Sequence, residues 1–262
     1  GARPMDRKPI VEVRDLVGGY GGHLVLDRIS LDVYEGEIVV VIGGSGCGKS
    51  TLLKNMLGLL RPVSGSIRYW GQEITTMDEE ELALLLQRLG IAFQSGALFN
   101  SMTVGENIAL PMEEYGRMDP ALREILVGIK LDLVGLSGTA GLMPDELSGG
   151  MKKRVGFARA IAVDPRIVFF DEPSTSLDPI IAAGLDKLIL DMRRLLGITV
   201  FVVTHDLASI RLIADRIVML DRGRVIFTGT VADVERTGVP RVRQFFDRQP
   251  DKTIEARGVR TP

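Results

Sequence analysis

The sequence is poor in cysteine, in long apolar runs and in excess charge of one sign. A single cysteine, Cys47, among 262 residues excludes an internal disulfide framework and a cysteine-rich metal site, and it fits a reducing cytoplasm. The longest apolar runs, IVVVIGG, RIVFF and ITVFVV, are far shorter than the roughly 20 residues of a membrane-spanning helix. Lys and Arg number 32 against 34 Asp and Glu, so no general attraction to nucleic acid is expected.

Short apolar runs alternate with helical patterns along most of the chain. The runs at 37–43, 166–172 and 199–205 are continuously apolar, which is typical of strands buried on both faces of a sheet. Helical patterns at 49–60 and 179–197 follow two of these strands. This alternation predicts an α/β fold with a mostly parallel sheet. Further strands are expected at 10–16 and 29–33, and in a hairpin at 216–229 that turns at Asp221–Gly223.

One internal region departs from this alternation, because its patterns are helical with no convincing strand between them. We therefore expect a helical subdomain at 94–163, inserted into an α/β core formed by 9–93 and 164–237. Another helix is expected at 76–89, where acidic residues fill the first turn. The C-terminal tail, 238–262, holds one short amphipathic piece, RVRQFF, before it becomes polar.

The stretch VVVIGGSGCGKST combines a buried strand, a glycine-rich loop and the start of a helix. It matches the P-loop pattern as Gly43-x-x-x-x-Gly48-Lys49-Ser50. The glycines let successive N–H groups point at phosphate oxygens, and the helix N-terminus adds a favourable dipole. Lys49 would supply charge to the β- and γ-phosphates, and Ser50 a hydroxyl to Mg²⁺. The alternative is a glycine-rich turn without a ligand, and Cys47 is expected to be a small packing residue.

A second strand ends in two carboxylates. The run RIVFFDEP places Asp171 and Glu172 at its end. An aspartate at the end of a buried strand beside a P-loop can hold Mg²⁺, usually through water. The adjacent Glu172 can act as general base on the attacking water. The alternative is a pair of surface carboxylates at the start of a loop, which the apolar run up to Asp171 disfavours.

A second glycine stretch, DELSGGMKKR, looks like another phosphate cradle at a helix N-terminus, but it has no lysine at P-loop spacing. With this stretch the chain resembles the ATP-binding-cassette (ABC) ATPases across about residues 10–237. Gly43–Thr51 match the Walker A loop, Ile167–Glu172 match Walker B, and LSGGM at 147–151 matches the signature loop. The resemblance implies an active ATPase with a P-loop NTPase (RecA-like) fold, including N-terminal antiparallel strands and an inserted helical subdomain.

The resemblance also explains why the second cradle is incomplete. It implies that two copies of the chain pack head to tail, so that each ATP lies between one P-loop and the signature loop of the other copy. The opposite P-loop then provides the lysine. Two positions differ from the commonest family pattern: Gly44 stands where many members have proline, and Met151 where many have glutamine.

Four further residues acquire roles only through the resemblance. Gln94 matches the glutamine that senses Mg²⁺ and the γ-phosphate, Asp178 lies in the D-loop, and His205 matches the switch histidine at the γ-phosphate. Tyr20 matches the aromatic residue that stacks on adenine, although a tyrosine in such a turn is often only a packing residue. The expected catalytic residues are Lys49, Glu172 and His205, the expected Mg²⁺ ligands are Ser50, Gln94 and Asp171, and the expected ATP-binding residues are Tyr20, Gly43, Ser45, Gly46, Cys47, Gly48, Lys49, Ser50, Thr51, Gln94, Ser148, Gly149, Gly150 and Asp178.

The segment FQSGALFNSMTVGENIALP narrows the branch of the family. Together with LMPDELSGGM and PRVRQFF it resembles the ATPases of Mla/Mce-type systems, which move lipids between bacterial membranes. The resemblance implies a peripheral protein on the cytoplasmic face of the inner membrane. Its implied partners are a second copy, a membrane permease contacted through the 95–115 region, an MCE-domain lipid-binding protein and, in some systems, a STAS-domain subunit. The other interpretation of Leu98, Phe99 and Met102 is core packing of the helical subdomain.

Two other functions stay open at this point. The first is a soluble cassette ATPase of translation or DNA repair. Translation members usually carry two cassettes, and repair members insert coiled coils or zinc sites, whereas this chain shows one cassette, no long heptad insertion and one cysteine. The second is another transporter, such as an amino-acid or metal importer, which would share the whole nucleotide site.

Overall fold

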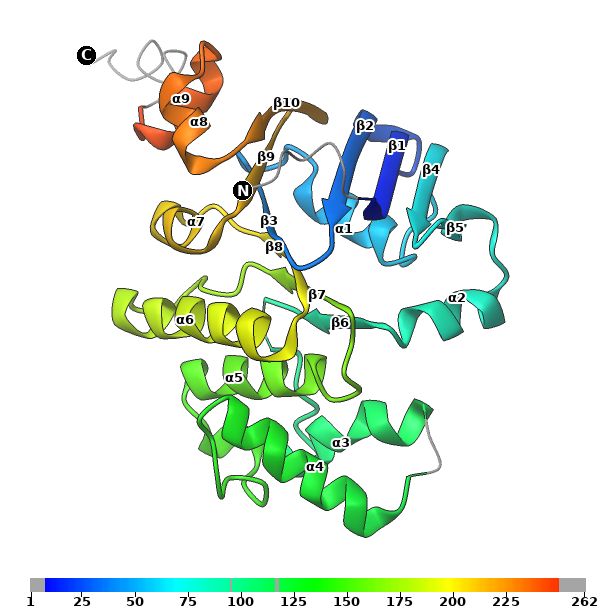
Figure 1. Cartoon of the computed structure of the whole chain (residues 1–262), viewed down its shortest axis with the longest axis vertical. Coiled ribbons are helices and arrows are strands. Elements are labelled where there is room, and N and C mark those ends of the chain that lie inside the picture. Colours follow the sequence, from blue (N-terminus) through cyan, green and yellow to red (C-terminus); the bar gives the residue numbers. More distant parts are fainter. Residues whose placement is uncertain (1–7, 95, 116–117, 250–262) are drawn as a thin grey trace, which may run out of the picture.

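The computed structural model describes residues 8–94, 96–115 and 118–249, and Figure 1 shows its sheets and helices. The strands are β1 (Pro9–Tyr20), β2 (His23–Tyr34), β3 (Ile38–Gly43), β4 (Ser64–Tyr69), β5 (Gln72–Glu73), β6 (Leu89–Ala92), β7 (Ile167–Asp171), β8 (Thr199–Val203), β9 (Arg216–Asp221) and β10 (Arg224–Gly229). The helices are α1 (Lys49–Met56), α2 (Glu79–Leu86), α3 (Val104–Tyr115), α4 (Pro120–Leu133), α5 (Gly149–Ala160), α6 (Pro179–Leu196), α7 (Leu207–Ile213), α8 (Val231–Arg236) and α9 (Pro240–Phe246).

The larger sheet has six strands in the order β10-β9-β3-β8-β7-β6. Neighbours from β9 to β6 are parallel, whereas the edge strand β10 runs antiparallel to β9. The smaller sheet is antiparallel, in the order β2-β1-β4-β5. These two sheets confirm the expected α/β fold, with a mostly parallel core and antiparallel strands near the N-terminus.

The core strands form where continuous apolar runs were found. Every residue of β3 is buried, and β7 and β8 are buried almost throughout. Such strands need helices on both faces, since neither face can meet water. Because β3, β7 and β8 are parallel neighbours, their carboxyl ends meet at one edge of the sheet. The P-loop, the Asp171–Glu172 pair and His205 follow these three ends.

One expectation about the chain before residue 94 was wrong, and one strand there was missed. The helix expected at 76–89 is only α2, because residues from Leu89 onward form β6, which pairs in parallel with β7. A short apolar run such as LGIA cannot be assigned to helix or strand by periodicity alone, and the neighbouring strand decides it. Strand β4 was also missed, although it pairs with β1.

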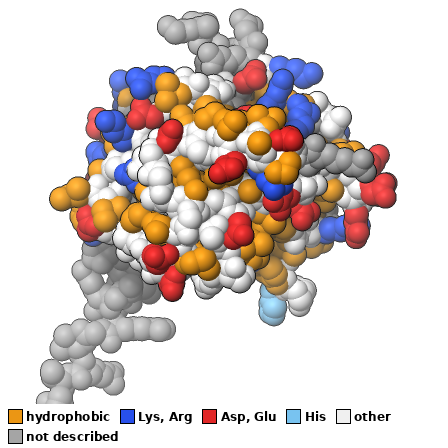
Figure 2. Space-filling model, turned by 90° about the horizontal axis from the view of Figure 1, so that it is seen from below, with side chains coloured by type: hydrophobic (Ala, Val, Ile, Leu, Met, Phe, Trp, Pro, Cys, Tyr) orange, Lys and Arg blue, Asp and Glu red, His pale blue; other side chains and the backbone are white. Residues whose placement is uncertain are grey.

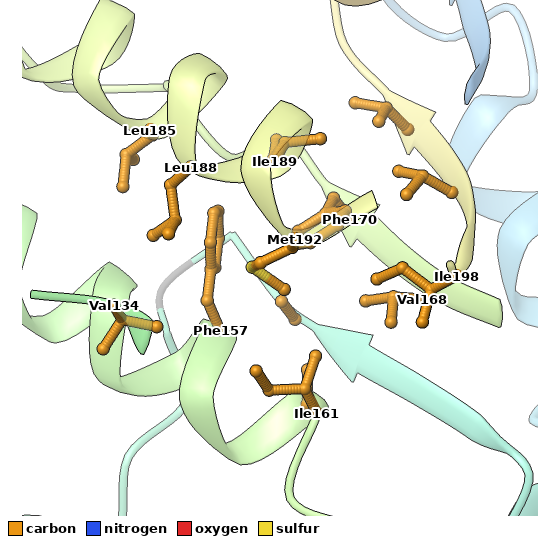
Figure 3. Packing of buried hydrophobic residues seen from close by; sticks show 14 of the residues in the cluster. Val134, Phe157, Ile161, Val168, Phe170, Leu185, Leu188, Ile189, Met192 and Ile198 are labelled. Atoms are coloured by element: carbon orange, nitrogen blue, oxygen red, sulfur yellow. The ribbon is translucent and has the colours of Figure 1, made fainter. Parts of the chain in front are cut away.

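The expected helical region contains α3, α4 and α5, which lie together below the core in Figure 1. Helix α5 is also part of the core packing. Its Phe157 ring lies 4.5 Å from the Phe170 ring of β7, and Figure 3 shows Phe157 pointing toward Leu188 and Met192 of α6. One buried hydrophobic cluster runs from α4 through α5 to the sheet. The subdomain boundaries at 94 and 163 therefore stay a prediction.

The amphipathic piece RVRQFF forms α9, which buries Val242 and Phe246, while the polar end of the tail lies outside the described residues. None of the helices within 8–94, 96–115 and 118–249 combines the length and the hydropathy that a bilayer crossing requires. Figure 2 shows the molecule from its helical end, where hydrophobic side chains lie among acidic ones. The coloured side chains of this face form no broad basic patch.

Candidate functional site

The P-loop backbone adopts conformations that require glycine at two positions. Gly43 has φ of 151° and Gly48 has φ of 110°, which are conformations that residues with a Cβ rarely adopt. A Cβ on Gly43 would lie 2.3 Å from Leu220 O, and one on Gly48 would lie 2.6 Å from a methyl carbon of Leu26. Space and backbone angle therefore both select glycine at these two positions.

The side chains of Lys49 and Cys47 have different environments in the loop. Lys49 Nζ lies over the loop and donates to Gly43 O (2.8 Å) and Gly44 O (3.1 Å). Cys47 is buried, and this burial raises the pKa of its thiol although Lys49 lies close by. The thiol is thus a poor nucleophile, in agreement with the expected packing role, and Cys47 can meet a phosphate only through its backbone.

A cavity of about 1280 Å³ opens beside the P-loop. Its lining brings together nine of the residues expected to bind ATP or Mg²⁺ or to act in catalysis: Gly43, Ser45, Gly46, Lys49, Ser50, Gln94, Asp171, Glu172 and His205. These residues come from four separate parts of the sequence, because each part follows a strand end at the same sheet edge. The expected residues outside this lining are Tyr20, Cys47, Gly48, Thr51, Ser148, Gly149, Gly150 and Asp178.

Glu172 is held in place from several sides. Its backbone is left-handed, with φ of 48°, and its amide donates to Val203 O (2.8 Å). Its carboxylate Oε1 lies 2.9 Å from His205 Nδ1, and Oε2 accepts from Thr175 Oγ1 (3.2 Å). The Glu172 side chain is 14% exposed, whereas that of His205 is 62% exposed. A carboxylate this well oriented can accept a proton from a positioned water.

The residues expected to bind Mg²⁺ are hard oxygen donors. Ser50, Gln94 and Asp171 all line the main cavity, and hydroxyl, amide and carboxylate oxygens are the ligands that Mg²⁺ prefers. Burial and the neighbouring Glu172 raise the pKa of Asp171, while Lys54 and Lys49 act in the opposite direction. Among the described residues, no three His, Cys, Asp or Glu form a ready-made metal cage. The donor set fits an ion that also binds phosphate and water.

The signature loop lies away from the P-loop of its own chain. Ser148 caps α5 by accepting from Met151 N (3.3 Å), and Ser148 and Gly149 are exposed. Neither lines the main cavity, although Gly149 lines a smaller cavity of about 480 Å³ together with Gln94 and Asp171. One copy therefore presents its signature loop to the outside.

Tyr20 and Asp178 also stand apart from the main cavity. Tyr20, at the end of β1, is 44% exposed, and Lys54 Nζ lies 5.6 Å from the centre of its ring. Asp178 caps α6 by accepting from Ile180 N and Ile181 N, both at 3.0 Å. A helix cap is a structural role, so direct contacts of Tyr20 and Asp178 with a nucleotide stay predictions.

Several residues near the site were missed. Thr175 contacts the Glu172 carboxylate, and the buried Lys153 of α5 donates to Glu172 O (3.3 Å). Burial lowers the pKa of Lys153, while the Glu172 charge opposes this shift. Both residues lie in or next to recognised motifs, yet their spacing carries no signal for these contacts. Arg211, Phe245 and Arg248 also line the cavity, from α7, α9 and the residues after α9.

Comparisons with known proteins agree with this geometry. The family model for ABC transporters matches residues 26–175. The chain is 40% identical over 248 residues to the intermembrane phospholipid transport system ATP-binding protein MlaF of Escherichia coli K12, covering 95% of this chain and 92% of the relative. It is 42% identical over 228 residues to the methionine import ATP-binding protein MetN of Brucella abortus, covering 87% and 62% respectively.

Two solved structures of ATP-binding cassettes also resemble this chain. The dimeric cassette MJ0796 in a post-hydrolysis state with ADP and Pi has a TM-score of 0.77 and 30% identity, covering 84% of this chain and 98% of that one. CbiO1 of Clostridium perfringens, part of the transporter complex CbiONQ, has a TM-score of 0.80 and 30% identity, covering 87% and 91%. With its P-loop, carboxylate pair and signature loop in this fold, the chain belongs to the ATP-binding subunits of the ABC transporter family.

Proposed function

We propose that the chain hydrolyses ATP to drive phospholipid transport between bacterial membranes. The observation that carries this proposal is the similarity to MlaF, which extends over 95% of this chain and 92% of the relative. A match of this extent includes segments outside the nucleotide site. The nucleotide site supports the ATPase part of the proposal.

The chemistry would use the residues of the main cavity. Lys49 and the P-loop amides would hold the β- and γ-phosphates, while Glu172 would take the proton of the attacking water. His205, 2.9 Å from Glu172 Oε1, would orient this carboxylate and contact the γ-phosphate. Mg²⁺ held by Ser50, Gln94 and Asp171 would offset negative charge on the phosphates. Every group needed on the P-loop side is present in one chain.

A second copy would complete each site. The exposed Ser148 and Gly149 support this arrangement, since their hydroxyl and amide groups are accessible to another molecule. Two solved structures of one relative, the cassette MJ0796, are described as dimeric. A head-to-tail dimer of identical chains would create two equivalent sites related by a two-fold axis.

The membrane partner would bind around residues 95–115. Phe99 is 50% exposed, so the alternative that its ring fills the core of the helical subdomain is wrong. Leu98 does pack against the core, and Met102 is half-buried. An exposed aromatic ring five residues after Gln94 in the sequence suits a short partner helix from a permease. The chain would then lie on the cytoplasmic face of the inner membrane, with MCE-domain and STAS-domain proteins as further partners.

Import of a small molecule such as an amino acid is the second candidate. The 42% identity to MetN favours it, but that similarity covers only 62% of the relative. The nucleotide site is common to both functions and cannot separate them. The choice therefore depends on what the assembled transporter carries.

The test is to purify the complex from its native host through an affinity tag on this chain. Lipid analysis of the complex should find bound phospholipid, and phospholipid vesicles should stimulate ATP hydrolysis by the reconstituted complex. The Glu172→Gln complex is the control, because it should assemble without turnover. A permease that brings no lipid, and whose ATPase responds to methionine or another amino acid, would contradict lipid transport.

A further inference from the structure

The residues that link β6 to α3 are held mainly by the helical subdomain. We call residues 96–103 the linking segment. Arg159, near the C-terminal end of α5, donates from Nη2 to Gly96 O (2.8 Å) and from Nη1 to Ala97 O (2.9 Å). Burial lowers the pKa of this guanidinium, yet arginine stays charged at any physiological pH. The two hydrogen bonds from this partly desolvated cation to adjacent carbonyl groups are strong and directional, and they hold the linking segment in place.

Asn107 of α3 holds the other end of the linking segment. It is fully buried, and its Oδ1 accepts from Phe99 N (2.8 Å) and from Arg159 Nη1 (3.4 Å). Its Nδ2 donates to Phe99 O, Met102 O and Thr103 O at 2.9–3.1 Å. A single buried amide thus satisfies the backbone on both sides of the exposed Phe99 ring, and it connects that backbone to Arg159.

The backbones also touch directly. Gly96 has φ of 72°, and a Cβ there would lie 3.1 Å from Lys152 O of α5. A Cβ on Gly156 of α5 would lie 3.3 Å from Gly96 Cα. On its other side the linking segment continues from β6 through a turn in which Gly96 N donates to Phe93 O (2.9 Å). The packing and side-chain contacts therefore attach the linking segment to α5 and α3.

Helix α5 connects the signature loop at its N-terminus to the linking segment near its C-terminus. Ser148 caps its N-terminus and is exposed, whereas Arg159 stands eleven residues later, about 16 Å along the helix axis. Between these ends, Phe157 anchors the helix in the hydrophobic cluster shown in Figure 3. A displacement of Ser148 along the helix axis would therefore reach Gly96 and Ala97 through a rigid element.

The geometry points to Arg159 and Asn107 as positioning residues that fasten the linking segment to the signature helix. Through these contacts a displacement of α5 would be transmitted to the backbone on either side of Phe99. The part of this inference that concerns the permease rests on the proposed function. The attachment itself concerns only the isolated chain.

The first experiment measures amide hydrogen exchange in the isolated, full-length protein. Arg159→Lys should raise exchange within 96–103 about tenfold, the effect of losing one charge-assisted hydrogen bond, with smaller changes elsewhere. Arg154→Lys is the matched control, because Arg154 lies on the same helix but donates to Val134 O (2.9 Å) inside the helical subdomain.

Asn107→Asp should raise exchange at 99–103, since it loses three donated hydrogen bonds. Equal exchange in the Arg159 and Arg154 variants, or a rise spread evenly over α3, α4 and α5, would overturn the attachment.

The second experiment uses the permease complex in phospholipid vesicles. Arg159→Lys should still co-purify with the permease, but lipid transported per ATP hydrolysed should fall about three- to thirtyfold, whereas Arg154→Lys keeps the wild-type ratio. A merely structural residue would lower both rates together and leave the ratio unchanged, and that result would overturn the positioning role. If the wild-type chain binds no permease, the proposed function fails, and the exchange measurement still decides the attachment.

Discussion

At the scale of single residues, the candidate site depends on Glu172 adopting an unusual backbone conformation. A left-handed φ of 48° is uncommon for a residue with a side chain and costs about 1–3 kcal/mol. The bonds to Val203, His205 and Thr175 offset this cost and direct the carboxylate into the main cavity. Strain of this kind at the end of a buried strand fits a residue whose orientation matters more than its stability.

Replacing this carboxylate tests its role as general base. In the Glu172→Gln variant, ATP hydrolysis should fall about 10²- to 10⁴-fold while ATP affinity is retained, because the amide keeps the shape but accepts no proton. Steady-state turnover and equilibrium ATP binding measure the two effects separately. Lys49→Ala is the comparison, since it should weaken ATP binding itself. Wild-type turnover in Glu172→Gln would show that another group is the base.

Asp186 of α6 is a buried carboxylate behind the site. It is 3% exposed, its Oδ2 accepts from Ser209 Oγ (2.8 Å), and its Oδ1 accepts no hydrogen bond from the described residues. Burial is the main cause that raises its pKa, and the nearby Asp206 adds to the shift while the Ser209 bond opposes it. The folded chain therefore binds this proton more tightly than the unfolded chain does.

The pH dependence follows from the direction of that shift. The free energy of unfolding should fall as the pH rises from the ordinary aspartate pKa through the raised pKa of Asp186. Above the raised pKa the full cost of burying the ionised carboxylate should persist. Asp186→Asn should thus raise the melting temperature at pH 7, with the gain shrinking as the pH falls. A gain of about 1 kcal/mol corresponds to about 2–4 °C for a chain of this size. The control is Asp191→Asn on the same helix, where the carboxylate pairs with Arg194 (2.9 Å). A lower melting temperature for Asp186→Asn than for the wild type at every pH would contradict the idea that ionised Asp186 destabilises the fold.

The site residues differ in how far sequence could predict them. Lys49 was predictable from the P-loop spacing and Asp171 from its place at the end of an apolar run, whereas His205 was assigned only through the family resemblance. All three line the main cavity, because parallel strands end at one edge of the sheet. Thr175 was not predictable, because its contact with Glu172 depends on the turn that follows Glu172, and Lys153 was not, because its contact depends on how α5 packs against the sheet. Long-range packing of this kind leaves no spacing in the sequence.

At the scale of elements, helix ends were predictable where end signals are strong. Helix α6 begins after the Asp178 cap with Pro179 and ends at Gly197, whose φ is 65°. Helix α2 has a good start, because Asp78 and Glu81 form a capping box, but it has no glycine at its end. The expected helix was therefore extended into β6, where pairing with β7 overrides the local pattern.

Met102, beside the exposed Phe99, tests the proposed contact surface. Met102→Glu should leave ATP binding unchanged and the melting temperature within a few degrees, but lower permease co-purification at least about tenfold, because a buried interface carboxylate lacks a partner. Leu195→Glu is the matched control, since Leu195 is 63% exposed at the far end of α6. Normal co-purification and transport would remove Met102 from the contact. A large fall in melting temperature would instead indicate core packing.

At the scale of the whole molecule, the exposed signature loop predicts that a site needs two copies. Ser148→Arg should abolish most hydrolysis while leaving ATP binding to the isolated chain largely intact, because Ser148 lies outside the main cavity. Mixing this variant with Lys49→Ala should restore one complete site per mixed dimer, so activity should exceed that of either variant alone. ATP turnover of the mixture, measured against each variant at the same total concentration, checks this. A severe loss of ATP affinity in the Ser148→Arg monomer would show that the loop acts within its own chain.

The hydrophobic cluster that joins α4 and α5 to the central sheet has a consequence for how the molecule melts. Phe157 fills space between Phe170 and the buried side of α6, so removing the helices would open the sheet to water. The inserted helices therefore cannot come loose as an independent module. Heating should produce one calorimetric transition rather than two. A fragment that contains residues 94–163 alone should lack fixed tertiary packing.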